Sequence, residues 1–301
     1  MDVSVIIVNY NTKKLTNECI SSIVQETSGI QYEIILVDNA STDGSIELFR
    51  ADKRVKFIES CENLGFGKAN NLGYLYTKGK YILLLNSDTL LLNNAIKYFF
   101  DYAEHSVDNI ACLGGLLLNQ QFDIIHSFGS FPSCGNLLLH ALSTYLHLFG
   151  IKCEYNERKH IKSSFFVDYI TGADLFIKRE AIEKVGFFDP EFFLYYEETD
   201  LQRRFTSAGY KMMIIDTPKI IHLDGGSSHK KGKLTMKQMS YITDGRFKYA
   251  KKHFSSFSYL IFRICYLLFR FFPVLLNHYS LKEKWQYLSI LLKSKNYVDT
   301  H

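Results

Sequence analysis

A carboxylate that could hold a metal ion follows one of the apolar runs of this sequence. Asp88 stands after the run at 81–85, in a short polar loop with Asn86, Ser87 and Thr89. Mg²⁺ and Mn²⁺ prefer oxygen ligands, and an ion bound there could neutralise a diphosphate leaving group. An Asp that only caps the next turn would give the same pattern, so both interpretations of Asp88 stay open.

A second carboxylate and a glycine-containing segment could contact a nucleotide. Asp38 ends the apolar run at 33–37 and could accept hydrogen bonds from a base or a ribose, although an Asx turn before Ser41 is the alternative. The segment ENLGFGKANN (62–71) has the spacing GxGxxN, not GxGxxG, and it follows the third apolar run instead of the first, which argues against a dinucleotide site. Its glycines could still admit a phosphate close to the backbone, with Lys68 supplying positive charge.

Three acids and one histidine could take part in catalysis. Glu197, Glu198 and Asp200 stand at an expected helix start, directly after the aromatic run FFLYY (192–196). Partial burial and mutual repulsion would raise one pKa toward that of a general base, whereas stabilisation of the helix dipole is the alternative. His222 stands just before a flexible Gly-Gly-Ser-Ser segment (225–228), so it could bind a metal beneath a lid or be purely structural.

Strand-like and helix-length segments alternate around these side chains. Strands are expected at 3–9, 33–37, 55–58 and 81–85, with helices at 12–25, from 41 onward and at 65–76. This alternation predicts βαβ units, and therefore an α/β fold with a Rossmann-like, mostly parallel sheet flanked by helices. Ligands of such sheets bind beyond the carboxyl ends of the strands, where the polar groups at 9–11, 38–39 and 86–88 would meet.

The middle of the chain gives weaker local signals. Strands are expected at 110–118, 165–170, 175–177 and 211–215, with 122–126 as a hairpin partner of the first. Helices are expected at 137–149, 179–185 and 199–208.

The charge of the 301 residues is divided unevenly along the chain. Residues 229–301 hold 14 Lys and Arg against three acids, whereas residues 1–228 hold 21 against 28. We therefore expect a catalytic domain at 1–228, with a nucleotide-binding part at 1–90 and an acceptor part at 91–228, and a basic, aromatic, helical region at 229–301. A basic region of this kind suits an anionic partner, either nucleic acid or a membrane surface, and no nucleic-acid-binding motif accompanies it.

The basic region contains a long apolar segment, 259–276, that is interrupted by charge. Arg263 and Arg270 make insertion across a bilayer costly, and together with Ser256 and Asn277 they recur every seven residues as one polar stripe. This pattern favours a helix lying in the membrane interface, assisted by Lys230, Lys231, Lys251 and Lys252. Packing on the catalytic domain or on a second subunit is the alternative, so a homodimer stays open. The six cysteines form no CxxC pair and the N-terminus shows no signal-peptide pattern, so we expect a cytoplasmic protein, peripheral at the inner face of the cell membrane.

Six segments in order resemble family 2 glycosyltransferases, particularly the bacterial rhamnosyltransferase-like branch. They are SVIIVNYNT (4–12), VDNASTDGS (37–45), ENLGFGKANNLG (62–73), LLLNSDT (83–89), TGADLFIKREAIEKVGFFDPEFFLYYEETDLQRR (171–204) and HLDGGSS (222–228). The resemblance implies a GT-A fold, a divalent metal (Mn²⁺ or Mg²⁺), a dTDP-, UDP- or GDP-linked sugar donor and inversion at the anomeric carbon. It also implies a glycan or lipid-linked acceptor in cell-surface polysaccharide synthesis, with rhamnose as one candidate sugar.

The resemblance also implies roles for individual residues. Donor binding falls to seven positions: Val8, Tyr10, Asp38, Asn63, Lys68, Asn70 and Ser87. Metal binding falls to Asp88, the last acid of a DxD motif whose first acid is Asn86 here, and to His222. Glu198 matches the catalytic base, with Glu197 as the fallback because the family commonly has Asp in a Glu-Asp pair. Asp200 is expected to orient the helix start or Arg203, and the acceptor side would comprise Gly172, Ala173, Asp174 and Tyr196.

Two other classes of function compete with this one. A nucleotidyltransferase that makes nucleotide sugars would show a Gly-rich, basic triphosphate loop near its first strand, and Asn9-Tyr10-Asn11-Thr12 is not such a loop. A non-catalytic sugar-binding scaffold protein would be expected to have lost its acids, yet Asp38, Asp88 and Glu198 are all present.

Overall fold

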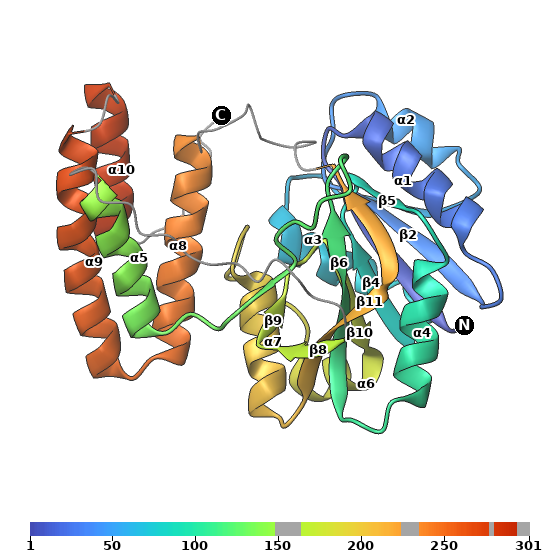
Figure 1. Ribbon diagram of the computed structural model, residues 1–301. Helices are drawn as coiled ribbons and strands as arrows, with labels where there is room; N and C mark the ends of the chain where they lie inside the picture. Colours follow the sequence, from blue (N-terminus) through green and yellow to red (C-terminus); the bar gives the residue numbers. More distant parts are fainter. Residues whose placement is uncertain (148–163, 224–234, 277–279, 294–301) are drawn as a thin grey trace. The chain divides into compact units, whose positions relative to one another are not determined.

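The computed structural model describes residues 1–147, 164–223, 235–276 and 280–293 (Figure 1). The chain forms two compact units. The first, here called the sheet unit, comprises Met1–Phe131, His160–Phe193 and Glu197–Lys233. The second, here called the helical unit, comprises Pro132–Lys159, Leu194–Tyr196 and Leu234–His301. The predicted boundary at 228/229 remains a prediction, and the helical unit also takes in a segment from the middle of the chain.

The sheet unit is built on a mostly parallel sheet. Four parallel strands form one side in the order β3 (Lys56–Glu59), β2 (Tyr32–Asp38), β1 (Val3–Asn9) and β4 (Tyr81–Leu85). The order continues with β10 (Asp174–Lys178), β6 (Ile110–Leu118), β11 (Lys211–His222) and β5 (Thr89–Leu91). β10 is antiparallel to β4 and β6, β11 is parallel to β6, and β8 (Phe165–Val167) pairs with β11. β7 (Phe128–Gly129) and β9 (Tyr169–Ile170) form a separate two-stranded sheet.

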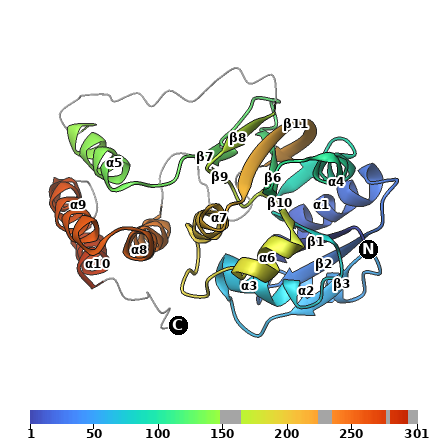
Figure 2. The ribbon, with the colours of Figure 1, turned by 90° about the horizontal axis from the view of Figure 1, so that it is seen from below.

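Helices cover both faces of the main sheet (Figure 2). Side chains alternate along β1, so Val5 and Ile7 pack on one face and Ile6 packs on the other. The first face carries α1 (Lys13–Glu26), α2 (Ser45–Arg50) and α4 (Ala95–His105), and the second carries α3 (Gly65–Tyr74), α6 (Arg179–Val185) and α7 (Glu197–Ser207). Both layers of core are therefore centred on the strands whose apolar runs predicted the fold.

The helical unit consists, within the described residues, of α5 (Cys134–His147), α8 (Met236–His253), α9 (Ser256–Leu276) and α10 (Leu281–Lys293). Its core is largely aromatic and includes Phe247, Phe262, Tyr266 and Tyr287. The helix predicted at 137–149 is α5, and it packs against α9. No helix in the described parts of the chain is long and apolar enough to cross a membrane.

Three local predictions differ from the structure. The segment 122–126 makes only an isolated bridge between Leu118 and Ile124, because the Asn119 side chain closes a tight loop by accepting from Gln121 and Asp123 N–H groups. The strand expected at 165–170 is divided into β8 and β9. Finally, β5 was not predicted, and β11 runs past Ile215 to His222 with an irregular register before Lys219.

Candidate active site

The end of β1 is tied to the end of β2 by a buried polar network. Asn9 and Asp38 lie opposite each other in the parallel register, and Asn9 Nδ2 donates to Asp38 Oδ2 at 2.6 Å. The other carboxylate oxygen of Asp38 accepts from Ser41 N at 2.8 Å, three residues on, and so closes the turn that follows β2. Asp38 is therefore fully buried and shapes the loop after β2, while its contact with a base remains a prediction. Of the neighbouring predicted donor-binding residues, Tyr10 is exposed and Val8 is partly buried.

The same network reaches the loop that carries Asp88. Thr12 and Thr16 both donate to Asn9 Oδ1, at 2.8 and 2.7 Å. The Thr12 hydroxyl also lies 3.0 Å from Ser87 Oγ. Ser87, predicted to bind the donor, is thus held beside the loop after β1. Asn9 belongs to the polar group at 9–11 that was expected here, but neither Asn9 nor Thr12 was predicted as a site residue, although their place at a strand end was a usable signal.

Asn39 fixes the glycine-containing segment at the start of α3. Its Nδ2 donates to Asn63 Oδ1 at 3.0 Å and its Oδ1 accepts from Leu64 N at 2.8 Å. Gly65 has φ +77°, and a Cβ there would meet the Phe193 carbonyl oxygen at 2.1 Å, so only glycine fits. Asn63 and Asn70 hold this backbone, since Asn70 Nδ2 donates to Phe66 O, whereas Lys68 is exposed.

Asp88 and His222 meet through strand pairing. β5 begins directly after Asp88 and pairs antiparallel with the end of β11, so that His222 lies opposite Thr89. His222 Nε2 is 3.2 Å from Asp88 Oδ1, and Leu223 N donates to Asp88 O at 2.9 Å. Both side chains keep a small exposed fraction, 17% for His222 and 12% for Asp88, so a ligand can reach them. The residues after Leu223, including the predicted lid, lie outside the described parts of the chain.

The Asp88–His222 pair suits a divalent cation that shares its ligands with a diphosphate. A carboxylate oxygen and an imidazole nitrogen converge there, and Mn²⁺ accepts both donor types. The described residues contain no group of three or more His, Cys, Asp and Glu able to hold a metal ion. The protein therefore offers two donors at this point, and the other coordination positions would fall to donor phosphate oxygens and water.

A buried carboxyl group lies next to this pair. Asp174 starts β10 opposite Leu85, is completely buried, and accepts from Gly115 N at 2.6 Å. Its Oδ1 has no hydrogen-bond partner within the described structure. Burial raises the pKa of Asp174 to about 8, against weaker opposing effects of the Gly115 N–H and His222. The predicted contact of Asp174 with an acceptor sugar remains a prediction.

We expect Asp174→Asn to change how stability depends on pH. The folded-state pKa is raised, so between about pH 4 and 8 the unfolded chain has lost a proton that the folded chain keeps. Wild-type stability should therefore fall as pH rises through this window, by roughly 4 kcal/mol between pH 5 and 8, a loss that the neutral Asn does not show. Denaturant unfolding at pH 5 and 8 measures the difference, with Glu183→Gln as an exposed control. Equal pH dependence in wild type and Asp174→Asn would contradict the assignment.

Of the three acids at the start of α7, Glu198 has the properties of a general base. Glu197 and Asp200 are buried, whereas Glu198 is partly exposed. Burial of its carboxyl group raises the pKa of Glu198 to about 6, although hydrogen bonds from the N–H groups of Glu198 and Thr199 oppose the rise. Such a group is ionised at neutral pH and still basic enough to take a proton from a hydroxyl group.

Asp200 orients Arg204, not Arg203 as predicted. Arg204 Nε donates to Asp200 Oδ2 at 2.9 Å, one helical turn away, and its other nitrogens donate to the carbonyl groups of residues 185–187. Arg203 instead lies over the Phe131 ring, 5.0 Å from its centroid. Both arginines stand at a helical spacing from Asp200, (i, i+3) for Arg203 and (i, i+4) for Arg204, so the spacing alone did not decide between them.

The predicted acceptor residues are divided between the two units. Gly172, Ala173 and Asp174 belong to the sheet unit, where Ala173 O accepts from Asn86 N at 3.0 Å. Tyr196 belongs to the helical unit, where its hydroxyl accepts from Arg246 Nε at 2.9 Å. Tyr195 and Tyr196 both have left-handed φ values, +70° and +72°, which is a strained conformation for aromatic residues.

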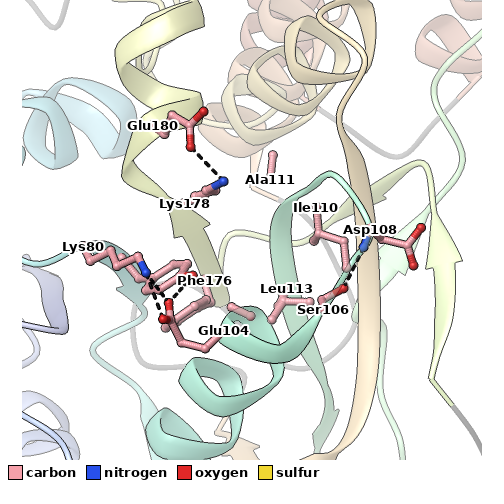
Figure 3. A pocket seen from close by; sticks show the side chains of 12 residues that line it. Lys80, Glu104, Ser106, Asp108, Ile110, Ala111, Leu113, Phe176, Lys178 and Glu180 are labelled. Carbon is pink, nitrogen blue, oxygen red and sulfur yellow. Dashed lines mark hydrogen bonds and ion pairs between the residues drawn. The ribbon is translucent and has the colours of Figure 1, made fainter.

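A cavity of about 410 Å³ lies away from these residues (Figure 3). It is lined at the start of β4 and β6 and the end of β10, by Tyr81, Ile110 and Lys178 among others. The ion pairs Lys80–Glu104 and Lys178–Glu180 lie on its wall. β4 begins at Tyr81, beside this cavity, and its other end leads into the loop of Asp88. The cavity therefore lies at the opposite ends of the strands and is not part of the candidate site.

Comparison with known proteins agrees with this geometry. Residues 4–127 match the model of Glycosyl transferase family 2. An uncharacterized glycosyltransferase of Haemophilus influenzae is 34% identical over 38% of this chain and 36% of its own length. The N-acetylglucosaminyl-diphospho-decaprenol L-rhamnosyltransferase of Mycobacterium tuberculosis is 25% identical over 63% of this chain and 66% of its own. This chain thus spans about a third of the length of the Haemophilus relative.

A solved structure confirms the fold class. The structure of GalNAc-T7 with UDP, GalNAc and Mn²⁺ matches 96% of this chain and 54% of its own with a TM-score of 0.59 at 16% identity. The predicted GT-A arrangement, a mostly parallel sheet flanked by helices, is therefore confirmed, as is the resemblance to family 2 glycosyltransferases.

Proposed function

Because residues 4–127 match the model of Glycosyl transferase family 2, we propose that this chain is an inverting glycosyltransferase that uses a nucleoside-diphosphate sugar. The observation that carries the proposal is the Asp88–His222 donor pair, and a partly exposed Glu198 with a raised pKa in the same unit supports it. Rhamnose is the proposed sugar, supported by the similarity to the mycobacterial rhamnosyltransferase. The proposed acceptor is a hydroxyl group of a glycan or lipid-linked saccharide in polysaccharide synthesis.

The reaction proceeds as a single displacement. Glu198 removes the proton of an acceptor hydroxyl group, and that oxygen attacks the anomeric carbon. The bond from this carbon to the diphosphate oxygen breaks, and the nucleoside diphosphate leaves with the electron pair. One displacement inverts the anomeric configuration. Asp88 and His222 would hold a divalent cation, which supplies charge neutralisation to the leaving diphosphate.

The donor side is formed by backbone and amide groups. Asn39 and Asn63 hold the start of α3 by accepting from Leu64 N and Gly65 N, and the positive dipole end of this helix suits a pyrophosphate. Lys68, exposed on the same helix, supplies a cation for the same charge. We propose that the seven residues implied by the resemblance bind the donor. Among them, Asp38 would shape the loop that meets the base.

The proposal predicts donor-specific release of a nucleoside diphosphate. A screen of dTDP-, UDP- and GDP-sugars with Mn²⁺ or Mg²⁺ should identify one donor whose hydrolysis or transfer needs the metal. Product stereochemistry by NMR spectroscopy then tests inversion, and retained configuration would contradict it. No release from any donor, together with no donor binding, would refute the transferase.

The proposed location is peripheral, at the cytoplasmic face of the cell membrane. Its support is the basic composition of residues 229–301 and the lipid-linked acceptor named in the mycobacterial relative. The alternative is that residues 229–301 form the interface of a homodimer.

A further inference from the structure

Helix α9 presents a continuous apolar face to solvent. Its exposed large side chains are all apolar: Phe257, Leu260, Ile261, Ile264, Leu268 and Phe271. At 100° per residue these six positions fall within about 100° of the helix circumference, and they extend over about 21 Å at 1.5 Å per residue. The stripe is long and narrow, as in helices that lie flat in a bilayer interface.

The arginines of α9 are turned away from this face. Arg263 lies over the Phe247 ring, 4.4 Å from its centroid, and its Nη2 donates to Leu292 O at 3.2 Å. Arg270 lies over the Tyr266 ring, 5.6 Å from its centroid. The two arginines of the predicted polar stripe therefore pack inside the helical unit, because the aromatic core offers both guanidinium groups a partner and the carbonyl groups of α10 accept from Arg263. Ser256 is exposed, and Asn277 lies outside the described residues. The opposite side of the helix is left for an external apolar partner.

The charges around α9 decide between a bilayer and a second copy of the chain. The exposed charged residues of α8, α9 and α10, within the described parts of the chain, are all lysines: Lys237, Lys251, Lys252 and Lys282. Of the acids, Asp244 is largely buried and paired with Lys248, and Glu283 is partly buried. Two such basic surfaces repel each other, whereas an anionic membrane attracts both.

We propose that the apolar face of α9 inserts shallowly into an anionic lipid surface, with Lys251 and Lys252, in the last turn of α8 just before α9 begins, contacting the headgroups. This inference rests on the peripheral location proposed above and names the surface responsible. It requires no sugar substrate, so its test is independent of the transferase activity.

The test is flotation of the full-length protein with phosphatidylcholine vesicles that contain or lack phosphatidylglycerol. Wild type should bind the anionic vesicles, and high salt should weaken the binding. Ile264→Asp with Leu268→Asp should lower binding at least about tenfold, because two charges enter the inserted face. Lys251→Gln with Lys252→Gln should lower binding to anionic vesicles only.

Val107→Asp is the matched control, since Val107 is fully exposed on the sheet unit and should leave binding unchanged. The variants replace exposed side chains, and circular dichroism checks that they fold. Vesicle binding that survives Ile264→Asp with Leu268→Asp would overturn the proposal. The proposal would also be overturned if wild type does not bind vesicles and sediments as a dimer that the same double variant dissociates. The apolar face of α9 would then be a subunit interface.

Discussion

Glu198→Gln lowers the transfer rate by about 10²–10⁴-fold and leaves donor binding intact, if Glu198 is the general base. The amide keeps the size of the side chain but cannot take a proton from the acceptor. Wild-type activity should rise with pH through about 6, where the raised pKa of Glu198 lies, since the base acts only when deprotonated. The rate of nucleoside diphosphate release at saturating substrate, followed from pH 5 to 8, measures both effects.

The matched control is Glu191→Gln, an exposed carboxylate a few residues before α7. It should leave rate and pH profile unchanged. Donor affinity by calorimetry separates a lost base from a misfolded site. Full activity in Glu198→Gln, with loss in Glu197→Gln, would transfer the role to Glu197.

Asp88→Asn removes metal-dependent activity, with an expected loss of about 10²-fold or more. The carboxylate supplies one of the two protein donors that the described residues offer at this point, so the neutral amide should weaken binding of both the cation and the diphosphate that shares it. Activity titrated with Mn²⁺, and donor binding measured with and without the ion, are the measurements. His222→Ala should act in the same direction, and the double variant should be less than additive because the two residues serve one site.

Asp123→Asn, in an exposed loop of the sheet unit, is the control for the charge change. Full wild-type activity after removal of divalent ions by a chelator would contradict a metal at Asp88 and His222. A chelator-sensitive wild type together with an unaffected Asp88→Asn would place the ion elsewhere.

Local sequence pattern was enough for the first half of the fold. The runs at 3–9, 33–37 and 81–85 are apolar on both faces because helices cover both sides of the sheet, and this pattern repeats with each βαβ unit. The same runs end at Asn9, Asp38 and the loop of Asp88, so the edge of the sheet that carries the site was visible in the sequence. Acids at a helix start after an aromatic run are also a local feature, which made Glu197, Glu198 and Asp200 candidates for the base, whereas the choice of Glu198 came from the family resemblance and remains a prediction.

Contacts between distant segments were decided by the tertiary structure. The three residues of β5 are too few to show a period, yet their pairing with β11 is what brings His222 to Asp88. Burial of Asp174 depends on strands contributed from elsewhere in the chain, so its raised pKa could not be predicted from the sequence.

The same division holds for α9. Its sequence alone determined that the helix is amphipathic, with arginines at a spacing of seven and apolar residues between them. Only the tertiary structure decided which side faces outward, because an arginine packs as well on an aromatic core as it hydrates at a surface. Periodicity in the sequence determines which residues share a face of a helix. The partners available in the tertiary structure determine which of these faces points to the core and which to solvent.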